Sequence, residues 1–344
     1  MPRYLSLFLM LFALSACDKP KVRHVTRSFY YWKSIFDLSP SESQMMDSLH
    51  VEKLYIKFFD VTWHDINQAI PAAQLKVKHL PDRHIQIVPC VFITNETILQ
   101  LKDVATAELL AFKISKKIGQ IQKASGLPTP CEIQIDCDWN ETSRDKYFAL
   151  LSTLRKIRSN VSATIRLHQI LYKDKTGIPP VDRGTLMLYN MSAVGNLTTS
   201  NSIYDADETE KYLSEKTSYP LKLDVALPLF SWGVVFKDKK FKGIINNLNT
   251  EVVRKNLTFF RKTDVDNFYI CEMDTVFQGN YFRTGDMLRI EEVNVKDLEH
   301  AAASVNALIK TDSVVTVSLY HLDPAILNRY TYEQINTIYT SFDY

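Results

Sequence analysis

The chain has 344 residues, 46% of them hydrophobic and 23% charged, which is enough apolar material for one large folded core. Its formal net charge of +2 at pH 7 argues against nucleic acid or a broadly anionic molecule as the partner. After the N-terminal segment, no stretch reaches the roughly eighteen consecutive apolar residues that a transmembrane helix needs.

The first element in chain order is a signal sequence. Arg3 is followed by an apolar run of about ten residues, Leu5–Leu14, which is too short to span a bilayer. Leu14-Ser15-Ala16-Cys17 is a lipobox, the signal at which bacterial lipoprotein processing acylates the cysteine and cleaves before it. The sequence therefore predicts a signal peptide over residues 1–16 and a polar tether over 17–27. Acylated Cys17 would anchor the chain to a lipid bilayer of the bacterial cell envelope, with the inner or outer membrane left open.

Beyond the tether, strand-like apolar runs alternate with helical patterns almost to the C-terminus. The predicted strands are Ser28–Trp32, Lys53–Asp60, Ile85–Ile93, Glu132–Asp138, Val161–Leu167, Thr185–Met191, Leu221–Leu229 and Ser313–Leu319. The clearest amphipathic helices are predicted over Asp103–Ala124, Arg144–Arg158 and Val295–Lys310. Eight alternations predict an α/β fold, a (β/α)₈ TIM-like barrel, as one domain over residues 28–344. A doubly wound sheet is the alternative, although no Gly-x-Gly-x-x-Gly motif follows any strand.

One region interrupts this alternation. Residues 233–292 contain short apolar runs, such as Val234–Phe236 and Phe268–Cys271, joined by Lys-rich and Asn-rich connections. Such connections are typical of an excursion from a domain. We therefore predict a small insertion with antiparallel strands after the seventh barrel strand.

The most informative stretch is Ile133–Trp139, a predicted strand that ends in two aspartates and a tryptophan. Because side chains alternate across a strand, Asp136 and Asp138 are expected on the same side. When two carboxylates share one face, their repulsion raises the pKa of one of them, and a carboxyl group with a raised pKa suits acid–base catalysis. The alternative is that both pair with nearby cations and only stabilise the structure. Trp139 offers a flat apolar surface of the kind on which sugar rings stack.

The carboxyl ends of barrel strands carry the chemistry in this fold class, so these ends define the candidate site. All four tryptophans of the chain lie there, which favours a ligand cleft lined with aromatic side chains over packing at the barrel mouth. The predicted substrate-binding residues are Trp32, Asp60, Trp63, Trp139, Arg166, His168, Tyr189, Asn190, Trp232 and Tyr320. We expect Arg166 to keep Asp136 ionised, which would leave Asp138 as the tunable acid. A purely structural pair of Arg166 and Asp136 is the alternative.

The residue spacing predicts no metal and no cofactor. No Cys-x-x-Cys, His-x-His or Glu-x-x-His pattern is present, and Ser231 does not lie in the Gly-x-Ser-x-Gly elbow of a hydrolase. The cysteines after the lipobox are expected to be small buried side chains, with a disulfide left open. They are Cys90, Cys131, Cys137 and Cys271.

Two motifs resemble the chitinase-like glycoside hydrolases. Ile133–Trp139 resembles their fourth strand, whose pattern is D-x-x-D-x-D-x-E, and Met187-Leu-Tyr-Asn190 resembles their sixth-strand M-x-Y-[D/N] motif. With the two aspartates aligned, Asn140 takes the place of the acid glutamate, and Glu141 comes one residue late. In that clan the substrate's own acetamide is the nucleophile, so the resemblance implies that the essential acid is lost unless Asp138 replaces it.

Over most of its length, the chain more closely resembles a family of bacterial lipoproteins of unknown function. This likeness is carried by stretches such as Leu54–Asp60, Ile165–Gln169, Pro179–Gly184 and Asp224–Gly233. The resemblance implies an envelope lipoprotein and no particular activity.

Three functions remain open from the sequence. The first is an envelope glycoside hydrolase, with Asp138 as general acid, Asp136 orienting the acetamide or stabilising charge, and Tyr189 and Asn190 contacting the sugar. The second is a non-catalytic glycan-binding or scaffold lipoprotein on the same barrel. A carboxylic acid that reaches the cleft unpaired and with a raised pKa would distinguish the first from the second. The third is an assembly factor that meets a protein partner through the 233–292 insertion.

Overall fold

The computed structural model describes residues 23–66, 68–81, 85–213, 218–309 and 312–343. The predicted signal peptide, the lipidation site Cys17 and the tether up to residue 22 lie outside the described residues. In the part of the chain that is described, no helix has both the length and the apolar character needed to cross a membrane.

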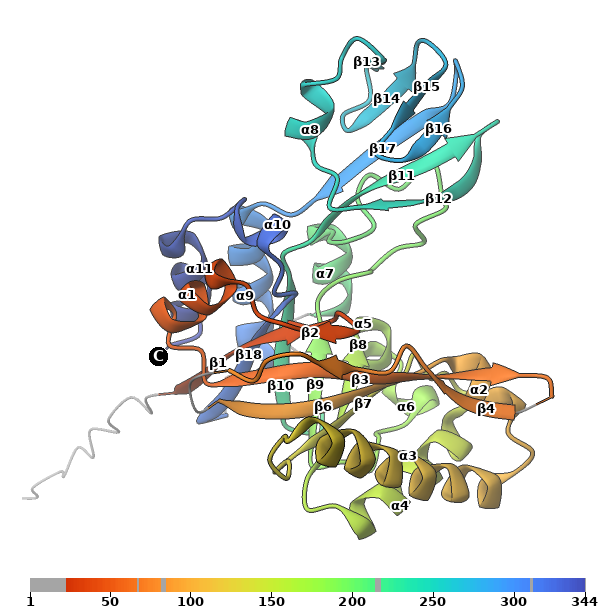
Figure 1. The fold of residues 1–344 in the computed structure, drawn as a ribbon, viewed down its shortest axis with the longest axis vertical. Helices are drawn as coiled ribbons and strands as arrows, with labels where there is room; N and C mark the ends of the chain where they lie inside the picture. Colours follow the sequence, from red (N-terminus) through yellow and green to blue (C-terminus); the bar gives the residue numbers. More distant parts are fainter. Residues whose placement is uncertain (1–22, 67, 82–84, 214–217, 310–311, 344) are drawn as a thin grey trace, which may run out of the picture.

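Eight parallel strands close into a barrel, as predicted, because β1 pairs with both β18 and β3 (Figure 1). The barrel strands are β1 (His24–Tyr31), β3 (Lys53–His64), β6 (Gln86–Ile93), β7 (Ile133–Asp136), β8 (Val161–Arg166), β9 (Arg183–Met187), β10 (Leu223–Pro228) and β18 (Val314–Tyr320). Each corresponds to one predicted strand. Three bounds differ from the prediction by four residues. β1 begins earlier, so residues 24–27, predicted as tether, belong to the barrel, and β9 ends earlier. β3 runs further, where β4 (Gln68–Ala72) pairs with it in antiparallel fashion. A minor pair, β2 (Ile35–Phe36) and β5 (Lys76–Val77), lies outside the barrel sheet.

Helices follow the strands and cover the barrel (Figure 1). They are α1 (Pro40–Ser48), α2 (Asn95–Gln100), α3 (Val104–Ser125), α4 (Arg144–Ile157), α5 (Leu167–Leu171), α6 (Lys173–Thr176), α7 (Ala206–Tyr212), α9 (Val295–Ile309), α10 (Pro324–Leu327) and α11 (Tyr332–Thr340). The longest, α3, begins where Asp103 accepts a hydrogen bond from the Thr106 amide, and ends at Gly126 in the left-handed conformation. Its buried face includes Leu110 and Ile114, which lie at helical spacing.

The predicted antiparallel insertion follows the seventh barrel strand and extends away from the barrel (Figure 1). Its sheet has the order β12-β11-β17-β14-β13, accompanied by a hairpin and a short helix. The elements are β11 (Ser231–Lys237), β12 (Lys240–Asn246), α8 (Thr250–Arg254), β13 (Phe260–Lys262), β14 (Phe268–Cys271), β15 (Thr275–Phe277), β16 (Asn280–Phe282) and β17 (Met287–Glu292). Gly233 allows close packing there, because a Cβ atom would lie 2.5 Å from Leu248 Cδ2.

A buried ion pair joins the insertion to the loop that follows β9. Arg289 Nε lies 2.6 Å from Glu291 Oε1, and both side chains are fully buried. Arg289 also donates to the carbonyls of Val194 and Asn196, at 2.7 and 2.6 Å. Glu291 Oε2 accepts hydrogen bonds from the amide and hydroxyl of Ser202. The loop that leaves the site strand β9 is therefore fixed to the insertion by charged contacts.

Candidate functional site

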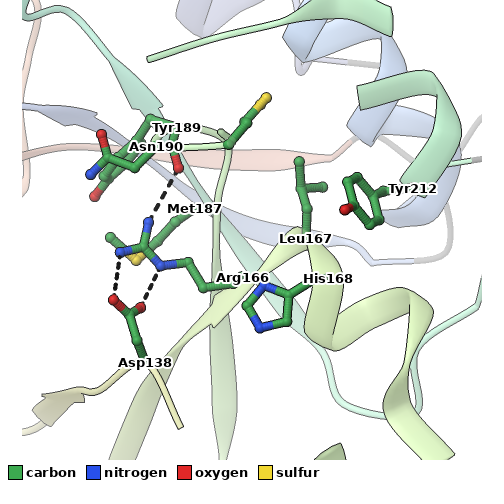
Figure 2. A pocket seen from close by; sticks show the side chains of 9 residues that line it. Asp138, Arg166, Leu167, His168, Met187, Tyr189, Asn190 and Tyr212 are labelled. Carbon is green, nitrogen blue, oxygen red and sulfur yellow. Dashed lines mark hydrogen bonds and ion pairs between the residues drawn. The ribbon is translucent and has the colours of Figure 1, made fainter. Parts of the chain in front are cut away.

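A cavity of about 390 Å³ opens at the carboxyl ends of β8 and β9, the end where chemistry lies in this fold class (Figure 2). It combines charged, amide and aromatic side chains with apolar ones. Its lining consists of Asp138, Arg166, Leu167, His168, Met187, Tyr189, Asn190, Met191 and Tyr212. Five of these were predicted as site residues; Tyr212 was not, because it lies on α7 and no strand end points to it.

The charged centre of the cavity is a bidentate pair of Arg166 and Asp138 (Figure 2). Arg166 Nε lies 2.5 Å from Asp138 Oδ1, and Nη2 lies 3.1 Å from Oδ2. Nη1 donates to the Tyr189 carbonyl at 3.2 Å, which ties the end of β8 to the chain beyond β9. The predicted pairing of Arg166 with Asp136 is wrong, because β7 ends at Asp136 and the chain then brings Asp138 to the guanidinium.

Asp136, the last residue of β7, is the carboxyl group with the perturbed acidity. Its side chain is only 7% exposed and accepts a hydrogen bond from Thr164 Oγ1 at 2.7 Å. Burial raises the pKa of Asp136 to about 6, with the Asp138 and Asp60 charges adding to the shift and Arg166 opposing it. The raised pKa was expected on Asp138. It falls instead on a carboxyl group that does not line the cavity.

Trp139 cannot act as a sugar-stacking surface, which corrects its predicted role. It is fully buried, and its ring stacks on Tyr147 of α4 at 5.2 Å between centroids. The indole Nε1 donates to the Thr176 carbonyl at 3.0 Å. Because the chain leaves the strand direction after Asp136, the Trp139 side chain is directed into the core between the barrel and its helices.

Aromatic side chains pack against one another across the barrel mouth. Tyr320 is central, with ring centroids 5.6 Å from Trp32, 5.1 Å from Tyr189 and 5.6 Å from Phe230. Phe230 continues the cluster to Trp232 at 5.0 Å. The strand ends of β1, β9, β10 and β18 thus meet in one aromatic cluster, and Phe230 is a member that the sequence analysis missed.

The remaining predicted residues separate into two groups. Asp60 Oδ2 pairs with Lys57 Nζ at 3.2 Å, and Lys57 lies over the Trp32 ring, so Asp60 belongs to the mouth. Trp63 does not belong there, because it shares its strand face with Phe59 and Val61, which line a cleft against α3.

Two further side chains have defined surroundings at the mouth. Trp232 donates from Nε1 to Glu291 Oε2 at 2.8 Å, so its polar edge is engaged by the insertion. His168 lies on α5 and lines the cavity; partial burial of its ring and the Arg166 charge lower the pKa of its imidazole. At neutral pH the ring is therefore a neutral donor and acceptor.

Three of the four described cysteines are buried. Cys90, Cys137 and Cys271 are buried as expected, whereas Cys131 is exposed, which corrects that prediction. These four are free thiols. Among the described residues, no group of three or more His, Cys, Asp or Glu side chains is placed to hold a metal ion.

No protein-family model and no curated protein matches the chain. Solved structures do match it. The spore cortex-lytic enzyme SleL of Bacillus cereus aligns over 93% of this chain and 75% of its own length, with 14% identity and a TM-score of 0.52. A chitinase of Chromobacterium violaceum aligns over 92% and 98%, with 12% identity and a TM-score of 0.51.

A mutant GH18 chitinase of Cycas revoluta, solved in complex with (GlcNAc)4, aligns over 92% of this chain and 99% of its own, with 11% identity and a TM-score of 0.51. At such identities the likeness shows the fold alone. The chain therefore shares with these enzymes the (β/α)₈ barrel that its sequence predicts.

Proposed function

We propose that the chain binds a glycan at the carboxyl-end mouth of its barrel and does not cleave it. The fold supports a glycan as the ligand, because a barrel of the same type in Cycas revoluta holds (GlcNAc)4. The composition of the mouth supports it as well. Aromatic rings next to a carboxylate and an amide suit a pyranose, which has apolar faces and polar edges.

One observation favours glycan binding over glycan hydrolysis. The carboxylate in the cavity, Asp138, is paired with Arg166, and Asp136, whose pKa is raised, lies outside the cavity. Both oxygens of Asp138 accept from Arg166, so a proton on either oxygen requires the loss of a contact. Asp136 is buried and does not line the cavity. Among the described residues that line the cavity, an unpaired carboxylic acid, which a hydrolase needs as its proton donor, is therefore missing.

The residues next in the motif do not supply that acid either. Asn140, in place of the acid glutamate, accepts hydrogen bonds from the Thr142 and Ser143 amides and so is used in the turn before α4. Glu141 is exposed on the same turn and does not line the cavity. The chemistry that remains is recognition: Asp138 and Asn190 would accept or donate to sugar hydroxyls. The buried Tyr189 hydroxyl, which has no partner in the described part of the chain, would gain one from the ligand.

Asp138→Asn is expected to weaken glycan binding at least about tenfold, because a charge-assisted hydrogen bond to a sugar hydroxyl is replaced by a neutral one. The measurement is isothermal titration of the full-length protein in detergent with chitotetraose and with peptidoglycan fragments, together with an assay of reducing-end release. We expect binding by the wild type and release by neither protein.

Asp145→Asn is the matched control, since Asp145 lies on α4 away from the cavity, is exposed, and forms its ion pair with the neighbouring Arg144. Release of reducing ends by the wild type that is lost in Asp138→Asn would overturn the binding function in favour of a hydrolase. If the wild type and Asp138→Asn bound the glycan with equal affinity, the cavity would not be the glycan site.

We further propose that Cys17 is acylated and anchors the protein in the bacterial envelope. The lipobox Leu14-Ser15-Ala16-Cys17 supports this proposal. Expression in a bacterium fed a radiolabelled fatty acid should label the wild-type protein and leave Cys17→Ser unlabelled and in its unprocessed, heavier form. Cys131→Ser, which removes an exposed thiol elsewhere, should keep the label. Equal labelling of wild type and Cys17→Ser would contradict lipidation at this residue.

A further inference from the structure

A second hollow of the molecule, a groove of about 1060 Å³, lies where the insertion meets the C-terminal part of the barrel. Residues of α8 and β17 form one side, and residues of α9 and of the segment from α10 to α11 form the other. Figure 1 shows α8 on the flank of the insertion and α9, α10 and α11 below it, beside the barrel. The groove shares no lining residue with the mouth cavity, so its chemistry is independent of the glycan site.

Arg329 is the residue that points to a ligand. Its Nη2 lies 3.1 Å from Glu292 Oε2, and its guanidinium lies over the Tyr330 ring at 5.6 Å. Nη1 of the same guanidinium is buried and has no hydrogen-bond partner among the described residues. A buried cationic N–H group without an acceptor is unfavourable, and a ligand oxygen in the groove would provide that acceptor.

The charges around the groove leave positive side chains without partners. Each of its three acidic residues is engaged: Glu251 by Lys255 at 2.6 Å, Glu292 by Arg329, and Asp297 by the Asn294 amide at 3.0 Å. Arg254 and Lys296 line the groove as well, and neither forms an ion pair with another described residue. Arg254 and Lys296 are therefore the cations of the lining that can pair with an anionic group on a ligand.

The rest of the lining is rich in amides. Asn267 and Asn328 line the groove, and their side chains make no hydrogen bond to another described residue. A carboxamide presents one acceptor and two donors, which complement the N–H and C=O groups of a peptide backbone. An elongated ligand that combines amide groups with a carboxylate matches both features of the groove.

We propose that this groove binds a short peptide through its free C-terminal carboxylate. The carboxylate would accept from Arg329 Nη1 and from Arg254, and Asn267 and Asn328 would pair with the peptide groups that precede it. Since the contacts reach the backbone and the carboxylate, a peptide of small side chains is sufficient for binding. The protein would then hold a glycan at one site and a peptide at another.

The test is calorimetric titration of the full-length protein in detergent with tetra-alanine, as the free acid and as the C-terminal amide. We expect the free acid to bind and the amide to bind at least about tenfold more weakly. Arg329→Met and, separately, Arg254→Gln should each reduce the affinity for the free acid. Arg254 is exposed, so its substitution leaves the fold intact and keeps the test valid if Arg329→Met unfolds.

Titration with chitotetraose separates this proposal from the glycan site. Arg254→Gln should bind chitotetraose as the wild type does, and Asp138→Asn should bind tetra-alanine as the wild type does. Absence of tetra-alanine binding, equal affinity for the acid and the amide, or an affinity unchanged in both arginine variants would each overturn the peptide site, whatever the glycan titration shows.

Discussion

Arg289→Met is expected to lower the free energy of unfolding by about 3–5 kcal/mol, because it leaves the buried carboxylate of Glu291 without its cation. Methionine keeps most of the side-chain length and the packing on Phe236 and Phe268, over whose rings the guanidinium lies at 5.2 and 5.6 Å. What it removes is the charge and the two hydrogen bonds to the loop after β9. The loss is therefore electrostatic rather than a loss of volume.

Urea unfolding at pH 7 measures this loss, and Arg261→Met is the matched control. Arg261 and Glu272 also lie 2.6 Å apart, but their side chains are 60% and 47% exposed. Such a surface pair contributes at most about 1 kcal/mol. The double variant Arg289→Met with Glu291→Leu should regain part of the stability, because it removes the unpaired charge as well. If Arg289→Met and Arg261→Met lowered the free energy of unfolding by the same amount, the buried pair would contribute no more to stability than the exposed one.

The barrel could be predicted because each of its strands carries its own pattern. Strands buried on both faces appear as apolar runs, and they remain recognisable without knowledge of their neighbours. The same holds for α3 and α4, whose apolar residues repeat at helical spacing. Closure of the barrel followed from the number of alternations, and the β1–β3 pairing confirms it.

The details of the site could not be predicted in this way, because they depend on where each strand stops. Side chains alternate between the two faces of β7 as far as Asp136 and not beyond it, because β7 ends there. One residue further, the chain turns, so Asp138 meets Arg166 and Trp139 enters the core. Trp63 illustrates the opposite case: β3 continues further than predicted and places this tryptophan on the face towards α3. A strand end identifies the region of a site, but not the direction of its side chains.

The contacts that Arg289 and Glu291 make with the loop after β9 gave no sequence signal, because that loop lies about ninety residues earlier in the chain. The pair nevertheless matters to the mouth. Tyr189 and Asn190, two residues that line the cavity, lie at the start of the loop that it fixes. The insertion therefore holds a loop that borders the mouth cavity without contributing its own side chains to the cavity lining.

Asp136→Asn is expected to stabilise the protein at pH 8 by up to about 3 kcal/mol and to have little effect below about pH 4. Burial raises the pKa of Asp136 from 3.8 to about 6 in the folded state. Between these two pH values the folded chain holds a proton that the unfolded chain has released. The contribution of this group is therefore fully present below pH 4 and is lost as the pH rises through 6. Asparagine does not ionise, so the variant avoids that loss.

Urea unfolding of both proteins at pH 4, 6 and 8 gives the difference directly, since all other titrating groups are common to both and cancel. The side-chain oxygen of the introduced asparagine can still accept the Thr164 hydroxyl, so the substitution removes the charge while keeping the hydrogen bond. Asp145→Asn, at an exposed carboxylate that pairs with Arg144, is the matched control. A difference that stays constant from pH 4 to pH 8 would contradict the raised pKa. A difference that grows with pH means that the buried carboxylate of Asp136 lowers the stability of the folded chain at neutral pH.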